Sequence, residues 1–171
     1  PPPGVQKLYK NGATVALVAM ERATRYVKVF LLRSHTDIWD ALQQLVDWCA
    51  ATVGTEIREL RGDCDTVWST GPLQRPTEQC VDFQVANQIH WSLSPPHTQA
   101  MNPIEGTIMG PLLGGMYASM AHAHVGAALW GDALEHSACV LNMGPTPGKD
   151  IPTDLLDKDF DPSQPDPRLQ Y

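Results

Sequence analysis

Residues 13–33, ATVALVAMERATRYVKVFLLR, contain two apolar runs separated by a short polar segment. The runs at 13–21 and 25–33 are rich in the β-branched and aromatic residues that favour strands. A short polar break between two such runs is typical of a hairpin. The sequence therefore predicts that the domain is built on an antiparallel pair of strands.

The segment after this hairpin, residues 34–53, changes to a helical period. Its apolar side chains recur at steps of three and four residues, which places them on one face of a helix. These side chains are Ile38, Leu42, Leu45, Val46 and Cys49. Ser34 or Thr36 can cap the start of the helix, and Gly54 can end it.

Two further strand patterns follow, with a helical pattern between them. Residues 56–62 alternate in polarity and predict a strand that runs into Asp63, and residues 89–93 alternate in the same way. Residues 66–76 contain Gly-Pro and Arg-Pro pairs and predict a loop. Residues 77–87 predict a helix, whose inward side chains we expect to be Cys80, Phe83 and either Val85 or Ala86.

The C-terminal part is predicted to be helical before it becomes extended. Residues 104–124 and 127–142 predict two helices, and we expect Pro111 to kink or break the first. Residues 147–171 are rich in Pro and Asp and predict an acidic tail with one short turn at 153–156. Residues 1–146 then form one α/β domain, in which helices flank a mixed sheet.

Charge and cysteine usage restrict the class of protein. The formal net charge is −7, nine of the twelve Lys and Arg residues lie at or before Arg75, and the next is Lys149. Because a generic nucleic-acid-binding domain carries a basic face, phosphate contacts must come from the N-terminal half, from backbone amides or from another chain. No apolar run is long enough to cross a membrane. Four widely spaced cysteines indicate free thiols, so we expect a nuclear or cytoplasmic protein that is not secreted.

Two carboxylates occupy positions that suit a metal site. Asp63 ends a predicted strand, and Glu105 lies in the first turn of a predicted helix. If the fold brings them together, they form an oxygen-rich site for Mg²⁺ or Mn²⁺. Each also has an ordinary explanation, since a strand-end Asp often stabilises a turn and a first-turn Glu complements the helix dipole. Spacing alone leaves both interpretations open.

Four blocks of sequence occur in order over about residues 12–156. The first is an apolar strand, Thr24-Arg25-Tyr26 and a second strand. The others are residues 57–63 (IRELRGD), 96–105 (PHTQAMNPIE) and 122–146 (HAHVGAALWGDALEHSACVLNMGPT). Together they resemble the catalytic core of copia-type LTR-retrotransposon integrases, within the retroviral integrase superfamily. The last block is the most specific, because it follows the family's Trp-x-Glu/Asp-Ala-Leu and Leu-Asn-x-x-Pro-Thr patterns.

This resemblance implies a ribonuclease-H-like fold with an Asp-Asp-Glu triad, and metal-dependent cleavage and strand transfer on DNA. Asp63 would correspond to the second aspartate and Glu105 to the glutamate, both as catalytic residues and as ligands of Mg²⁺ or Mn²⁺. Asn102 would correspond to the loop asparagine that positions the glutamate's helix. DNA would be the partner, and a homo-oligomer would be compatible with the family.

The chain departs from the family pattern in ways that bear on activity. The first aspartate would lie at or before Pro1, and no Asp precedes Asp37. We therefore expect a polyprotein segment that is truncated at its first strand and inactive by itself. Cys64-Asp65 replaces Asn-Gly, and Asp65 is either a further ligand or, as we favour, a turn residue. Residues 106–120 contain no Lys or Arg, although the family holds DNA there. The alternatives are a non-catalytic ribonuclease-H-like interaction scaffold and a decayed element fragment.

Overall fold

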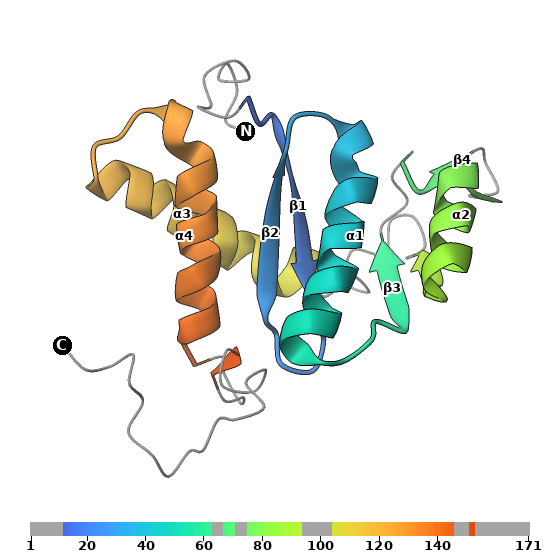
Figure 1. Ribbon diagram of the computed structural model, residues 1–171. Coiled ribbons are helices and arrows are strands. Elements are labelled where there is room, and N and C mark those ends of the chain that lie inside the picture. Colours follow the sequence, from blue (N-terminus) through green and yellow to red (C-terminus); the bar gives the residue numbers. More distant parts are fainter. Residues whose placement is uncertain (1–11, 63–66, 71–74, 94–103, 146–150, 153–171) are drawn as a thin grey trace, which may run out of the picture.

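The computed structural model describes residues 12–62, 67–70, 75–93, 104–145 and 151–152, with backbone only at 93 and 105–107. Its centre is a hairpin of strand β1 (Val15–Met20) and strand β2 (Val27–Leu32), as predicted. The strands pair antiparallel, from Val15 opposite Leu32 to Met20 opposite Val27. Figure 1 shows helices on both sides of this hairpin, so the fold has three layers.

Both faces of the hairpin are apolar, and each belongs to a different core. Because side chains alternate along a strand, β1 and β2 each send one set of residues to either side. The first core contains Ala16, Val18, Met20, Val27, Val29 and Leu31. The second core contains Val15, Leu17, Ala19, Phe30 and Leu32. The continuous apolar runs in the sequence follow from this burial on two sides.

The turn between β1 and β2 is held by the carboxylate of Glu21. Its oxygens accept hydrogen bonds from Ala23 N at 2.9 Å, from Thr24 N at 2.5 Å and from Thr24 Oγ1 at 2.7 Å. Arg25 then adopts a positive φ of 68°, and its amide donates to the carbonyl of Glu21 at 2.9 Å. Glu21 therefore closes the turn that contains Thr24-Arg25-Tyr26.

The first helical segment covers the second core, as the sequence predicts. It consists of η1 (His35–Asp37), α1 (Ile38–Trp48) and η2 (Cys49–Val53). Ser34 caps its start through a reciprocal pair of contacts with Asp37. Gly54 ends it with φ 63°, a left-handed conformation that suits glycine. The buried face of α1 consists of Ile38, Ala41, Leu42 and Leu45.

The first core is closed by two helical segments that contact each other. The first is η4 (Ile104–Met109) followed by α3 (Gly110–His122), and the second is η5 (Ala127–Leu129) followed by α4 (Trp130–Met143). The helical run continues past Pro111, so the expected break is absent, but an irregularity lies directly before this proline, where the π-helix η4 changes to α3. Proline has no amide hydrogen to donate, and it therefore interrupts regular helical hydrogen bonding.

Helices α3 and α4 pack closely where Gly115 meets Ser137. Ser137 is 3% exposed, and its hydroxyl donates to the carbonyl of Leu112 at 2.8 Å. A side chain at Gly115 would collide with the Ser137 hydroxyl, whereas a Cβ at Gly114 would meet no atom within 4 Å. The close approach buries Leu112 and Met116 almost completely. Burial of such side chains stabilises the fold by about 1.5–3 kcal/mol each.

Asn142 joins α4 to the outer edge of β2. Its Oδ1 accepts a hydrogen bond from Val27 N, and its Nδ2 donates to Val27 O, both at 2.7 Å. Asn142 is 6% exposed and Val27 is 2% exposed. The side-chain amide thus takes the place of a neighbouring strand at this point.

The remaining strands form two further pairs. Strand β3 (Glu59–Gly62) pairs parallel with β6 (His90–Leu93), and β4 (Ser69–Thr70) pairs antiparallel with β5 (Arg75–Pro76). The last pair lies in the predicted loop, which corrects that prediction. In the described residues no ladder joins β1–β2 to β3–β6, so the expected mixed sheet is present as separate pairs. Side chains of β1–β2 and of β3–β6 instead pack together in the second core.

Helix α2 (Glu78–Asn87) begins at Thr77, whose hydroxyl accepts from Cys80 N at 3.3 Å. Cys80 and Phe83 are buried as predicted. The expected third inward residue is wrong, since Val85 is 74% exposed and Ala86 is also exposed. The apolar residues of α2 are spread around the helix, and only Cys80 and Phe83 face the core.

The predicted tail at 147–171 lies outside the described residues except for Ile151 and Pro152, and so does the turn at 153–156. In the described part of the chain, no helix combines the length and the apolar character that a membrane span requires.

Replacing Asn142 with Ala should lower the free energy of unfolding by about 1–3 kcal/mol, because both polar groups of buried Val27 lose their partner. Urea unfolding measures the change. On the same helix, His136 is exposed, and His136→Ala should stay within about 0.5 kcal/mol of the wild type. Equal midpoints for the wild type and Asn142→Ala would contradict the role of this contact.

Adjacent glycines in α3 should respond in opposite directions to alanine. Gly115→Ala should destabilise the chain by about 1–3 kcal/mol, because the new methyl group overlaps Ser137. Gly114→Ala should stabilise it by about 1 kcal/mol, because alanine favours the helix and the space is open. Adding Ser137→Ala to Gly115→Ala should recover part of the loss. Shifts of the same sign for both single variants would refute the packing described.

Candidate functional site

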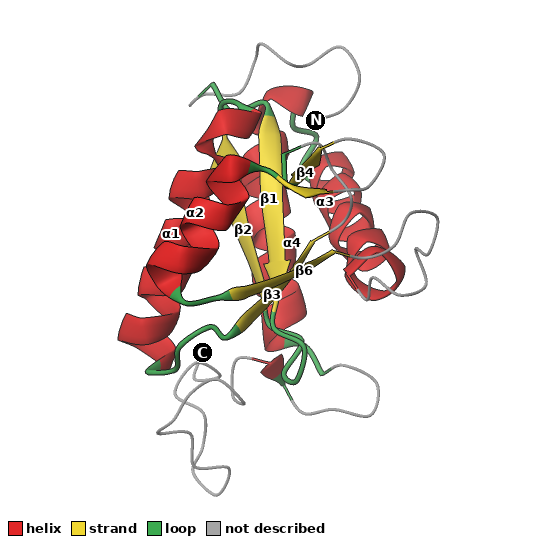
Figure 2. Cartoon of the chain, turned by 90° about the vertical axis from the view of Figure 1, so that its right-hand side faces the viewer, coloured by secondary structure: helices red, strands yellow, loops and turns green. Residues whose placement is uncertain are grey.

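The candidate site lies where β3 and β6 end. The two strands run parallel, with Glu59 opposite His90 and Gly62 opposite Leu93, and Figure 2 shows them side by side. In this register the two strands end at a common edge. Asp63 follows Gly62 directly, and the segment 94–103 follows Leu93. Ligands of α/β proteins commonly bind at such an edge.

The structure describes only one of the predicted site residues, and that one only in part. Glu105 is the second residue of η4, and only its backbone is described. Asp63, Asn102 and the alternative ligand Asp65 lie outside the described residues. Within the part of the chain that is described, no three His, Cys, Asp or Glu side chains gather as metal ligands. The metal-binding roles of Asp63 and Glu105 therefore stay predictions.

Aromatic side chains fix the strand end that precedes Asp63. The rings of Trp68 and Trp91 lie 4.8 Å apart, and Trp39 packs edge-on against Trp68 at 5.6 Å. A Cβ on Gly62 would lie 3.2 Å from Trp91 Cζ2 and 3.4 Å from Trp68 Cδ1. Glycine at this position allows both indoles to pack against the backbone.

A polar network crosses the exposed face of the same strand pair. The Ser92 hydroxyl donates to Glu59 Oε1 at 2.8 Å, and Arg61 Nε donates to Ser92 Oγ at 3.4 Å. Arg61 is exposed, so its positive charge lies one residue before Gly62 at the candidate edge. No sequence motif singles out Arg61 or Ser92. The parallel register of β3 and β6 brings them together.

Two other basic residues of the N-terminal half, Arg25 and Lys28, are partly buried. Lys28 Nζ lies 4.1 Å from the ring centroid of Trp48, a cation–π geometry. Burial lowers the pKa of the Lys28 ammonium, and the nearby Cys49 partly opposes this change. Nη1 of Arg25 is buried without a hydrogen-bond partner in the described structure. These two cations are thus poorly placed to contact a phosphate backbone.

Comparison with known proteins shows a similarity of fold. No protein-family model matches the chain, and no curated protein matches it. The structure is similar to a chain in the cryo-electron microscopy structure of the simian T-cell lymphotropic virus intasome in complex with PP2A regulatory subunit B56 gamma, with a TM-score of 0.64. The match covers 93% of this chain and 52% of that chain, with 13% sequence identity.

The α/β class expected from the sequence is confirmed by this likeness and by the helices and strands described above. At such low identity the shared property is the fold alone. The present chain spans about half the length of the chain that it matches. The likeness is therefore one of fold, and it extends over most of this chain.

Gly62→Ala should destabilise the chain by about 1 kcal/mol, because the new methyl group presses on Trp91. The tryptophan fluorescence of the folded state should also change, since the indoles at this strand end must move. Gly126→Ala is the matched control, because a Cβ at Gly126 meets no atom within 4 Å. An unchanged spectrum for Gly62→Ala would show that the indoles do not pack on this backbone.

Proposed function

We propose that the chain is the ribonuclease-H-like core of a copia-type retrotransposon integrase, acting on DNA. The observation that carries the proposal is the agreement of two independent likenesses. Four ordered sequence blocks resemble this family, and 93% of the chain matches the fold of a chain in a solved intasome complex.

The positions of the motif residues support the proposal. Trp130, Leu134 and Asn142 belong to the most specific block, and they are 3%, 3% and 6% exposed. Trp130 and Leu134 fill the core between α3, α4 and the hairpin, and Asn142 binds the edge of β2. These residues are the ones that the fold needs in order to pack. A shared motif at 122–146 therefore argues for a shared fold.

Asp63 and Glu105 would be the catalytic carboxylates and the ligands of Mg²⁺ or Mn²⁺. Carboxylate oxygens suit these hard cations, and Asp63 directly follows the strand end fixed by Trp91. Asn102 would position the helix that carries Glu105. When bound, such ions stabilise the attacking and leaving oxygens of phosphodiester exchange. Arg61 would contribute a positive charge at the same edge for a DNA phosphate.

A non-catalytic interaction scaffold is the second candidate. It is favoured by α3 (Gly110–His122), which contains no Lys or Arg. Each phosphate contact that a helix lacks weakens DNA binding and reduces its salt dependence. The net charge of −7 acts in the same direction. In this alternative the fold persists and the partner is a protein.

A strand-transfer assay with labelled duplex DNA and Mn²⁺ or Mg²⁺ tests the proposal. The assay compares the present chain with a chain extended upstream to include the preceding strand. We expect end joining from the extended chain only, because the first aspartate of the triad would lie in that strand. Asp63→Asn and Glu105→Gln should each reduce the activity at least about 100-fold.

Asp65→Asn is the matched control in the extended chain, because it removes a neighbouring carboxylate that we assign to a turn. It should keep the activity of the wild type. Full activity of either Asp63→Asn or Glu105→Gln would show that the assignment of the ligands is wrong. An extended chain that contains the upstream Asp, folds and joins no DNA ends with either metal would favour the scaffold.

A further inference from the structure

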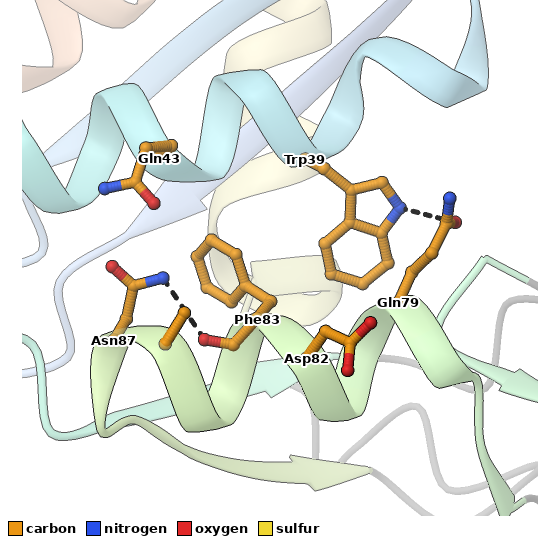
Figure 3. Close-up of a pocket in the computed structure, with 7 residues that line it drawn as sticks. Trp39, Gln43, Gln79, Asp82, Phe83 and Asn87 are labelled. Atoms are coloured by element: carbon orange, nitrogen blue, oxygen red, sulfur yellow. Dashed lines mark hydrogen bonds between the residues drawn. The ribbon is translucent and has the colours of Figure 1, made fainter.

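An open groove lies between α1 and α2, on the other side of the second core from the hairpin. Its volume is about 330 Å³, and Figure 3 shows side chains from both helices reaching toward one another across it. The aromatic wall consists of Trp39 and Phe83, whose ring centroids are 5.8 Å apart. The other lining residues are Gln43, Gln79, Asp82, Ala86 and Asn87.

Internal hydrogen bonds hold the polar side chains of this groove. Trp39 Nε1 donates to Gln79 Oε1 at 3.0 Å, which fixes the indole (Figure 3). Gln43 Nε2 donates to Asp47 Oδ1 at 3.0 Å, and Asn87 Nδ2 donates to the carbonyl of Phe83 at 3.1 Å.

These bonds use amide donors and leave acceptors for a ligand. The amide oxygens of Gln43 and Asn87 have no donor among the described residues, and neither does the exposed carboxylate of Asp82. The groove therefore combines an aromatic wall with three side chains that offer oxygen acceptors. A ligand that complements it must supply several hydrogen-bond donors and a flat or cationic group.

The charged residues of the two helices that form the groove have one sign. Helices α1 and α2 contain no Lys or Arg, and they carry four exposed carboxylates. These are Asp40, Asp47, Glu78 and Asp82. A phosphate backbone would be repelled here, whereas a cation would be attracted. Charge therefore selects a basic protein segment over a nucleic acid as the occupant.

We propose that this groove binds an arginine side chain from a basic segment of a partner protein. The guanidinium group has five donors and no acceptor, which matches the free oxygens of the groove. It stacks on Trp39 and pairs with Asp82, a combination that a lysine ammonium reproduces poorly. This site is separate from the β3–β6 edge, and it stands whether or not the chain has integrase activity.

The test is an NMR titration with a short acetylated and amidated peptide that contains two arginines spaced by glycines. The reporter is the indole N–H resonance of Trp39, which Trp39→Phe identifies. We expect a saturable shift with this peptide. A peptide in which citrulline replaces arginine keeps the shape without the charge, and it should bind at least about five-fold more weakly.

Two variants separate the groove from the general charge of α2. Asp82→Asn and Glu78→Gln remove one negative charge each from the same helix, but only Asp82 lines the groove. Asp82→Asn should weaken binding of the arginine peptide about five-fold, whereas Glu78→Gln should change it by less than about two-fold. Both residues are exposed, so the fold should tolerate both substitutions.

Three results would overturn the proposal. The first is equal affinity for the arginine and citrulline peptides. The second is an equal loss of affinity in Asp82→Asn and Glu78→Gln, which would indicate non-specific attraction to an acidic surface. The third is a short single-stranded DNA that shifts the Trp39 resonance and competes with the peptide, which would assign the groove to nucleic acid.

Discussion

The paired hydrogen bonds between Asn142 and Val27 hold the layers of this fold together. The two residues are 115 positions apart, and the bonds between them are buried. Val27 lies opposite Met20 of β1, but its N–H and C=O groups both bond to Asn142 and not to β1. Buried groups of this kind need partners, and one side-chain amide supplies both. Helix α4 is thereby fixed against the edge of the sheet.

That contact matters because the hairpin is buried on two sides. Strands β1 and β2 send alternate residues into two separate cores, so a shift of register by one residue would exchange the two sets of side chains. The Glu21 turn fixes the register at one end of the hairpin. Asn142 fixes the position of β2 relative to α4. The close approach at Gly115 and Ser137 then determines how α3 and α4 close the first core.

Features that depend on neighbours in sequence could be predicted, and features that depend on distant contacts could not. The β1–β2 hairpin, the cap at Ser34 and the end at Gly54 follow from local rules. The exposure of Val85 and the β4–β5 pair depend on which surfaces meet in three dimensions. Pro111 predicts an interruption of a helix, and only the structure shows that the interruption is a change from the π-helix η4 to α3.

The candidate site was less predictable than the fold for a related reason. A strand-end Asp and a first-turn Glu are common in proteins, so Asp63 and Glu105 gain meaning only from the family resemblance. The parallel register of β3 and β6 is what brings Gly62 and Leu93 to one edge, and no local pattern specifies it. Arg61 and Ser92 are adjacent for the same reason.

The distribution of charge gives the molecule two distinct surfaces. The β3–β6 edge carries the exposed cation Arg61, one residue before the end of β3. The groove between α1 and α2 carries carboxylates and amide oxygens around Trp39, and it suits a cation directly. A net charge of −7 would weaken DNA binding if it were spread evenly. Four of the nineteen carboxylates are exposed on α1 and α2, and screening by salt reduces their effect at distances beyond about 10 Å. The acidic composition is thus compatible with the proposed action on DNA, and part of it lies where we propose that an arginine side chain binds.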